Sequence, residues 1–398
     1  MLRKYLNKIK PNFEPGGKLH AFQSVFEGFE SFLYTPNSTS QSGTHVHDSL
    51  DSKRIMIIVV AALMPCLIFG MFNTGYQNYL CAGIEGSVWE KFAYGFLALL
   101  PRIIVTYVVG LGIEFIVAQW RKEEIQEGFL VTGILIPLIC PIETPVWMLA
   151  VATAFSVIFV KEVFGGTGYN IFNVALTARA FLFFAYPAQM SGDKAFIASE
   201  PICGLGGTVT YADGVSGATP LGQLATGTTE LTNAVGEPIS TLDAFLGLIP
   251  GSVGETSTLC ILIGAALLLF TGIASWKIML SVFAGGLAMG SVAYLLPSAT
   301  YPGSSLTPWD QLLYGGFAFA AVFMATDPVT AARTGAGKYI YGFLVGVIAI
   351  IIRVYNTGYP EGAMLAVLLM NALAPLIDYC VVQVNINRRM RRSRTGAQ

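Results

Sequence analysis

The sequence has little charge. Of its 398 residues only 12% are Asp, Glu, Lys or Arg, against about 25% in an ordinary globular protein. Hydrophobic residues make up 54%, and the mean hydropathy is +0.62. This supply of polar residues cannot cover a water-exposed surface, so the composition excludes a soluble enzyme domain. The formal net charge of -1 provides no field that attracts nucleic acid, and we expect no nucleic-acid partner.

Motifs for metal and nucleotide binding are also missing. The six cysteines are scattered without a C-x-x-C pair, which argues against an iron–sulfur ligand set or a disulfide framework. His45 and His47 lie in a polar stretch that is expected to be a solvated loop. No strand-associated G-x-G-x-x-G and no Walker loop occurs, and the GAGK of 335–338 has the wrong spacing. We therefore expect neither catalytic side chains nor an NADH site in this chain.

Long apolar runs are present instead. Residues 1–54 lack the apolar region of a signal peptide, so the first run is expected to be retained as a helix. Since about 20 apolar residues span a bilayer, the runs predict an all-α integral membrane protein of about ten helices. They are expected near 55–71, 94–119, 129–140, 146–160, 171–186, 259–271, 276–296, 312–324, 339–352 and 362–382.

Two of these helices are near half length. The third, 129–140, ends at Pro141, and the eighth, 312–324, is followed by Pro328. Broken helices are tolerated at membrane depth where protein or a cavity satisfies the freed backbone groups, so both are candidates for a site. The alternative is a short helix in a thin or tilted bundle.

Basic residues predict the orientation. With ten crossings, 18 of the 23 Lys and Arg fall on one side and four on the other, which leaves Arg179 inside the membrane. The side rich in Lys and Arg is expected to be cytoplasmic. The predicted regions are a cytoplasmic extension (1–54), a first membrane repeat (55–186), a periplasmic loop (187–258), a second membrane repeat (259–382) and a basic cytoplasmic tail (383–398).

An internal repeat is indicated by matched spacing. Thr-Gly-Tyr enters the fifth helix at 167–169 and the tenth at 357–359, and Gly-Phe opens the third and eighth helices at 128–129 and 316–317. Each unit has five helices, an odd number, so the chain starts the second unit on the opposite side of the membrane. The two units therefore run in opposite directions. This pattern predicts an inverted repeat with its functional site near the centre.

The outward loop contains the turn DGVSGATPL, in which Ser216, Gly217 and Ala218 precede Thr219. It resembles the D-G-x-S-G-A-T-x-L signature at which FMN phosphate is esterified to a threonine. Further stretches, among them FEPGGK at 13–18, KEVFGGTG at 161–168, IPGSVGE at 249–255 and FMATDPV at 323–329, resemble the B subunit of the bacterial sodium-translocating NADH:quinone reductases (the NqrB/RnfD family). They cover nearly the whole chain in order.

The resemblance implies a membrane subunit of a sodium pump. It implies covalent FMN on Thr219 and a non-covalent riboflavin near Asn170 and Asn173, whose amides suit an isoalloxazine edge. Capping of a helix start is the alternative interpretation of Asn170. Implied partners are an NADH-oxidising flavoprotein, a second FMN-carrying subunit, and ubiquinone or menaquinone, in the bacterial inner membrane. The 192–212 segment is longer than the family pattern predicts.

Ionisable residues within membrane segments are functional candidates by default. They are Glu114, Glu127, Glu162, Arg179, Asp327 and Asp378. The resemblance links Glu114, Asp327 and Asp378 to sodium uptake; structural pairing or interfacial placement is the alternative. Arg179 needs a carboxylate or an electron-rich cofactor edge, and the sequence leaves both open. The resemblance also places a quinone region at Gly110 and Leu111, where helix packing is the alternative.

Two other functions remain open. One is that of the D subunit of the related Rnf electron-transport complex, which shares the membrane core and the flavin threonine but lacks a long N-terminal extension. The other is a non-redox channel or transporter, because an inverted repeat with broken helices does not by itself define function.

Overall fold

The computed structural model describes residues 2–13, 52–121, 128–191, 195–211, 216–228, 230–298, 300–356 and 358–395, with a few single residues between 17 and 44. Helices dominate these ranges, and within them the only β pairing is three isolated bridges. The prediction of a helical protein is thus confirmed for these ranges.

The first half of the bundle contains long and short helices. They are α3 (Ser52–Ala82), α4 (Val88–Arg121), α5 (Phe129–Ile139), α6 (Val146–Ser156) and α7 (Val174–Ala185). A π-helical segment, η3 (Val157–Glu162), continues α6. The second half contains α11 (Thr258–Phe270), α12 (Trp276–Leu295), α13 (Asp310–Leu313), α14 (Phe317–Phe319), the π-helical η5 (Ala320–Met324), α15 (Gly335–Tyr355) and α16 (Ala363–Thr395).

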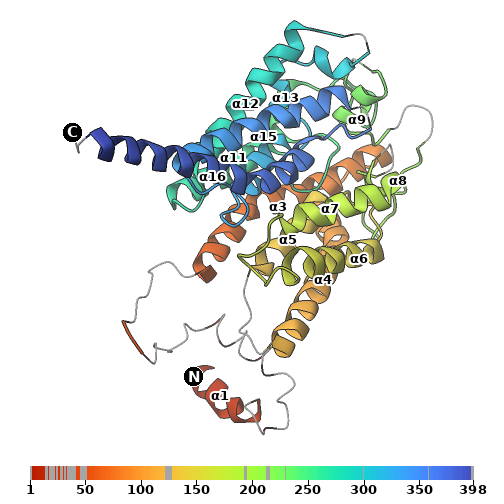
Figure 1. Ribbon diagram of the computed structural model, residues 1–398. Coiled ribbons are helices and arrows are strands. Elements are labelled where there is room, and N and C mark those ends of the chain that lie inside the picture. Colours follow the sequence, from red (N-terminus) through yellow and green to blue (C-terminus); the bar gives the residue numbers. More distant parts are fainter. Residues whose placement is uncertain are drawn as a thin grey trace.

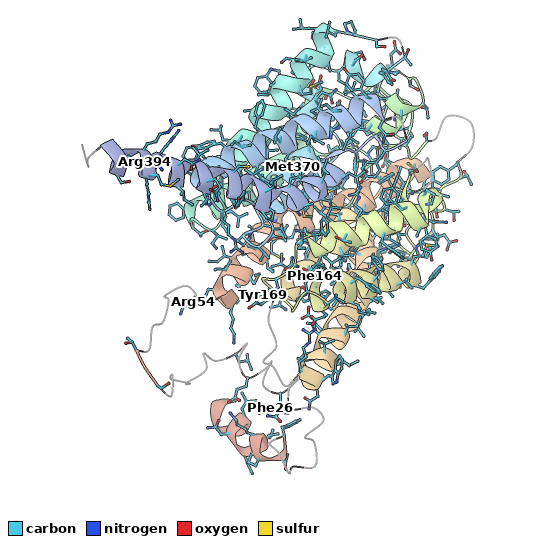
Figure 2. All side chains as sticks on the ribbon, viewed as in Figure 1. Phe26, Arg54, Phe164, Tyr169, Met370 and Arg394 are labelled. Atoms are coloured by element: carbon cyan, nitrogen blue, oxygen red, sulfur yellow. The ribbon has the colours of Figure 1, made fainter. Side chains whose placement is uncertain are left out.

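Smaller elements flank the bundle. They are α1 (Leu2–Ile9), η1 (Lys10–Asn12), α8 (Pro187–Met190), α9 (Pro220–Ala225), α10 (Thr241–Leu246) and η4 (Pro302–Ser305). In Figure 1, α8 and α9 lie at the upper right of the bundle, whereas the start of α3 and the end of α16 lie toward the opposite end. Figure 2 likewise shows Arg54 and Tyr169 at the lower left and Arg394 at the far end of α16.

Within the described ranges, five helices are long and apolar enough to cross a membrane: α3, α4, α12, α15 and α16. The helix α5 is short, as predicted. Its 11 residues rise about 16 Å, roughly half of the 30 Å hydrocarbon core. It ends at Ile139, where Cys140 turns to an extended conformation ahead of Pro141.

The predicted helix over 312–324 is wrong as a continuous element. The segment is broken into α13, α14 and η5, and the break contains Gly315 at φ 64° and Gly316 at φ 66°. These left-handed conformations favour glycine because they carry a steric cost for other residues. A Cβ on Gly316 would also lie 2.6 Å from the Glu255 carboxylate.

The first helix is longer than the predicted 55–71, because polar residues continue it inside the protein. Asn73, Gln77 and Asn78 are buried on α3. The Asn78 amide donates to the carbonyl oxygens of Ala198 (2.8 Å) and Gly207 (3.0 Å). The described part of the 192–212 segment is thus held against α3 by hydrogen bonds.

Close helix packing forms the core. The helix α3 contacts α4 and α11, α12 contacts α15, α15 contacts α16, and α16 also contacts α7. Glycines allow the backbones to approach: a Cβ on Gly95 of α4 would lie 1.7 Å from the Met71 carbonyl oxygen, and one on Gly346 of α15 would lie 2.2 Å from that of Val282. Small residues at helix interfaces are typical of membrane bundles.

Candidate functional site

Thr219 lies at the wall of a cavity of about 230 Å³. It precedes α9, and its hydroxyl accepts a hydrogen bond from the Gly222 backbone N–H at 3.1 Å. Phe183, Met190 and Phe196 give the cavity an apolar lining, and Arg179 and Glu361 also line it. The threonine singled out in the sequence therefore lies beside a cavity that contains both apolar and charged groups.

The rest of the predicted threonine turn is described only in part. Residues 212–215 lie outside the described ranges. Gly217 and Ala218 are buried, and the Ser216 hydroxyl accepts from the Ala218 N–H at 3.3 Å. Ala218 lines the cavity next to Thr219. Ser216 and Gly217 therefore shape the turn, and Ala218 contributes to the wall.

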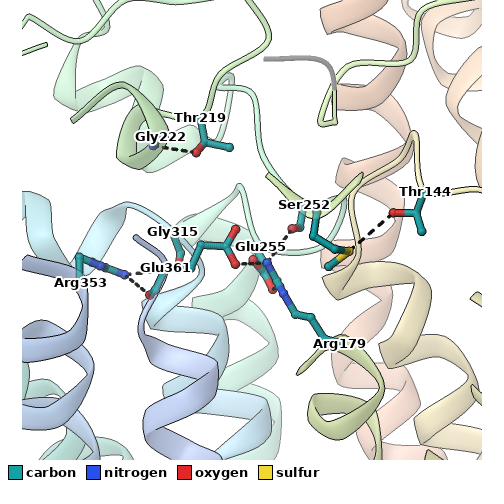
Figure 3. Close-up of polar contacts among 10 residues, drawn as sticks. Thr144, Arg179, Thr219, Gly222, Ser252, Glu255, Gly315, Arg353 and Glu361 are labelled. Carbon is teal, nitrogen blue, oxygen red and sulfur yellow. Dashed lines mark hydrogen bonds and ion pairs between the residues drawn. The ribbon is translucent and has the colours of Figure 1, made fainter. Parts of the chain in front are cut away.

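Arg179 is held by two carboxylates. It is 1% exposed on α7 and donates to Glu255 at 2.6 Å and to Glu361, with Ser252 at 3.5 Å. Figure 3 shows the guanidinium between the two glutamates, with Thr219 above them. The sequence left two kinds of partner open for Arg179, a carboxylate or an electron-rich cofactor edge. The structure shows two carboxylates.

Neither glutamate was singled out in the sequence. Glu255 ends the loop SVGE before α11, and Glu361 lies in YPEG before α16, so both resemble ordinary loop residues. Arg353 was also missed as a buried residue. It is 5% exposed and donates to the carbonyl oxygen of Gln311 and, at 3.3 Å, to that of Gly315. The only sequence signal was Arg179 itself, whose burial required a counter-charge.

The cavity also contains an unsatisfied donor. The Tyr359 side chain is 4% exposed, lines the cavity, and its hydroxyl has no hydrogen-bond partner among the described residues. Buried polar groups are nearly always hydrogen-bonded, so such a group indicates a ligand or water. The cavity thus offers a free phenol hydroxyl and aromatic walls, beside an arginine that two glutamates already neutralise. This lining suits a planar molecule with hydrogen-bond acceptors at its edge.

A second cavity, of about 100 Å³, lies among α3, α5, α7 and the segment after η5. Asn170, Asn173 and Asp327 line it. Asn173 is the residue that caps α7, accepting from the Leu176 N–H at 3.2 Å, and its amide donates to Asp327 at 3.2 Å. Capping by Asn170 is therefore wrong; its amide bonds the Phe172 carbonyl at 3.0 Å. We call this the inner cavity, and the one beside Thr219 the outer cavity.

The inner cavity, like the outer one, is lined by a buried hydroxyl that has no hydrogen-bond partner among the described residues. The Thr167 hydroxyl is buried without a partner among the described residues and belongs to the lining. Thr167 and Tyr359 come from the two Thr-Gly-Tyr segments of the chain. Each cavity is thus bordered by one of the matched segments and by one unpaired hydroxyl.

The other predicted sodium residues have separate surroundings. Glu114 is 5% exposed on α4 and pairs with Lys161 of η3. Asp378 is half-buried on α16 and accepts from the N–H groups of Arg333 (2.8 Å) and Thr334 (3.0 Å). No group of three or more His, Cys, Asp or Glu among the described residues is arranged to hold a metal ion. The structure therefore does not join the three carboxylates in one site.

Gly110 and Leu111 lie in a packed region. A Cβ on Gly110 would lie 1.8 Å from the Phe129 ring of α5, and Leu111 packs against the cluster of Phe129, Val157, Val160 and Val174. A flat ring could approach the Gly110 backbone only if Phe129 moved. Of the other ionisable residues, Glu162 pairs with Arg121 at 3.8 Å, and Glu127 lies outside the described ranges.

Membrane-capable helices around two cavities that contain buried charged side chains define a multi-pass membrane protein. The chain belongs to the NQR2, RnfD, RnfE family, whose model matches residues 39–387.

Curated relatives match over their full length. A protein of Chromohalobacter salexigens is 44% identical over 98% of this chain and 96% of its own, and one of Azotobacter vinelandii is 44% identical over 99% and 100%. A protein of Klebsiella pneumoniae is 44% identical over 98% and 99%. Each is named as the B subunit of a Na(+)-translocating NADH-quinone reductase.

Proposed function

We propose that the chain is the membrane-embedded B subunit of a sodium-translocating NADH:quinone reductase, which passes electrons to quinone while sodium moves outward. The observation that carries this proposal is the position of Thr219 beside a cavity that contains Arg179 and the unpaired Tyr359 hydroxyl. The full-length identity to proteins of that name supports it. The Rnf alternative loses support, because the relatives match 98–99% of this chain, N-terminal extension included.

The outer cavity fits an FMN esterified to Thr219. The threonine oxygen would carry the phosphate, and Phe183 and Phe196 would flank the ring system. The unpaired Tyr359 hydroxyl offers a hydrogen-bond donor to the edge of the ring, and Arg179, already bonded to its glutamates, lies beside it. When bound, the flavin supplies the one- and two-electron chemistry that side chains lack. Arg179, held by its two glutamates, would position the ring.

The inner cavity fits a neutral flavin such as riboflavin. Asn170 and Asn173 offer amide edges, Thr167 offers an unpaired hydroxyl, and Phe323 and Leu268 give apolar walls. Asn173 would keep its role as the cap of α7 while its amide faces the cavity. Quinone would be reduced near Gly110 and Leu111, with Phe129 moving to admit the ring.

Sodium would pass by Asp378, Glu114 and Asp327, whose oxygens are the hard ligands that the ion prefers. The absence of a three-carboxylate cluster among the described residues favours successive sites over one shared site. NADH would be oxidised on a separate flavoprotein, and a second FMN-carrying subunit would hand electrons to Thr219-bound FMN. The protein would lie in the bacterial inner membrane with both termini in the cytoplasm.

We also propose the inverted repeat of five plus five helices. In the first five-helix unit, the second helix, α4, contacts α5 and α6, and α6 contacts α7. In the second unit, the second helix, α12, contacts η5 and α15, and α15 contacts α16. The first helices of the two units contact each other (α3 and α11), as do the last (α7 and α16). Such like-to-like contacts are expected across a two-fold axis.

The experiment is in-gel flavin fluorescence of the chain from its native host, after denaturation. The wild type should fluoresce, Thr219→Ala should not, and Thr219→Ser, which keeps a hydroxyl, should retain the signal. A fluorescent Thr219→Ala band would place the attachment elsewhere. A dark wild-type band, with the flavin transferase present, would favour a non-redox channel.

A further inference from the structure

Lys161 is a buried cation that the function proposed above does not use. It lies on the π-helical segment η3, is 4% exposed, and pairs with the Glu114 carboxylate of α4. Single π-helical turns occur frequently at functional sites. A buried ion pair is weak evidence for stability, because desolvation offsets most of the attraction between the charges. The pair therefore calls for a functional explanation.

A second carboxylate borders the same cavity as the lysine, the inner cavity. Lys161 and Asp327 both line this cavity. Asp327 accepts from the Asn173 amide at 3.2 Å, the Thr330 hydroxyl at 3.1 Å and the Val329 N–H at 3.0 Å. Among the described residues no lysine or arginine nitrogen lies within 4.0 Å of it. In that part of the chain, Asp327 thus accepts three hydrogen bonds but lacks a cation.

The charges of Glu114, Asp327 and Lys161 can be balanced by one monovalent cation. When both carboxylates are ionised, Glu114 and Asp327 carry two negative charges against the one positive charge of Lys161. One monovalent cation would neutralise the group. The Thr132 and Thr326 side chains line the cavity with Asp327 and add hydroxyl oxygens, the ligand type that sodium prefers.

We propose that Lys161 is a tethered cation that alternates between Glu114 and Asp327, and that Na⁺ occupies whichever carboxylate the lysine leaves. A compact ammonium on a flexible four-carbon stem suits such a movement. In the described arrangement the lysine holds Glu114, and Asp327 is open to the ion. A molecule in the inner cavity that gains a negative charge would attract the Lys161 ammonium. The position of Na⁺ would then depend on the charge of that molecule.

This inference rests on the proposed function, which assigns sodium to these carboxylates. Its test is equilibrium binding of ²²Na⁺ to the purified complex. In Glu114→Gln the lysine should pair with Asp327 and weaken sodium binding about tenfold, the size expected from coupling within a contacting charge pair. Adding Lys161→Gln to that variant should restore the binding, because no lysine then competes with the ion for Asp327.

Failure to restore binding in the double variant would overturn the inference, as would a Glu114→Gln variant with unchanged binding while Asp327→Asn abolishes it. If Glu114→Gln and Asp327→Asn both bind sodium like the wild type, the proposed assignment of sodium fails instead. The control is Arg121→Gln, which breaks the neighbouring pair with Glu162 at the edge of the same π-helical segment and should leave sodium binding unchanged.

Discussion

Arg179 joins three segments that lie far apart in the chain. Its guanidinium on α7 binds Glu255 before α11 and Glu361 before α16. The sequence predicted that this buried arginine needs a partner, but not which one. Both glutamates follow glycine- or proline-containing turns, and nothing local distinguishes such residues from solvent-exposed ones. Only the tertiary arrangement brings them together.

Replacing Arg179 tests this arrangement. Arg179→Ala should destabilise the protein by about 3–5 kcal/mol, because it leaves two buried carboxylates without a counter-charge. Arg179→Lys should fall between the alanine variant and the wild type, since one ammonium cannot reproduce the planar fork. Thermal denaturation of the purified complex in detergent measures the effect. Arg333→Gln, at an exposed side chain, is the control, and equal stability of Arg179→Ala and this control would contradict the proposed pairing.

Asp378 offers a second test at this scale. Its oxygens accept from the N–H groups of Arg333 and Thr334 and from the Thr334 hydroxyl, which caps α15. Asp378→Ala should therefore weaken the sodium stimulation of quinone reduction and also loosen the start of α15. A variant with the sodium dependence of the wild type would remove Asp378 from the ion pathway and leave it only the capping role.

At the scale of elements, the packing of α4 on α5 depends on one glycine. A Cβ on Gly110 would meet the Phe129 ring at 1.8 Å, whereas one on Gly112 would meet nothing within 4 Å. Gly110→Ala should destabilise the protein by about 1–3 kcal/mol through overpacking. Gly112→Ala should be neutral or slightly stabilising, because alanine favours the helix.

Thermal denaturation of both variants checks this prediction. Phe129→Leu combined with Gly110→Ala should recover part of the loss, since the smaller side chain leaves space for the added methyl group. If Gly110→Ala is as stable as Gly112→Ala but impairs quinone reduction, the packing interpretation is wrong, and a direct contact with quinone is favoured.

Element positions follow well from hydropathy, whereas boundaries and breaks do not. The short helix α5 was predicted because Pro141 limits its apolar run. The first helix was predicted too short, because Asn73 and Asn78 resemble a helix end until their hydrogen bonds inside the protein are known. The break at Gly315 and Gly316 was predicted only in part: the Gly-Phe pair at 316–317 was expected to open a helix, but the apolar run was begun at 312. Glycine is common in membrane helices, and its left-handed conformation is invisible in the sequence.

For the whole molecule, the charge count predicts that the Thr219 region faces the periplasm and the C-terminal tail the cytoplasm. Cys203 is exposed in the same predicted loop as Thr219 (187–258), and Ser393 is exposed on the tail. A membrane-impermeant maleimide added to intact cells with a permeable outer membrane should label Cys203. It should label Ser393→Cys only after the inner membrane is opened. Cys203→Ser is the control, and the reverse labelling would invert the proposed orientation.

The relation between the two halves also belongs to this scale. The matched Thr-Gly-Tyr segments led us to propose the repeat, and each segment borders one cavity, the first through Thr167 and the second through Tyr359. The cavities themselves could not be predicted, because their walls combine residues from distant helices. The resemblance supplied the candidate residues, and the structure added Glu255, Glu361, Tyr359 and Lys161 to them.

The central claim is that Thr219 carries a flavin that delivers electrons into the bundle. The most direct measurement is peptide mapping by mass spectrometry of the chain purified from its own host. We predict that the peptide containing Thr219 is heavier by one FMN less one water, with fragment ions that place the added mass on Thr219. An unmodified Thr219 peptide from a flavin-containing, active complex would contradict this claim.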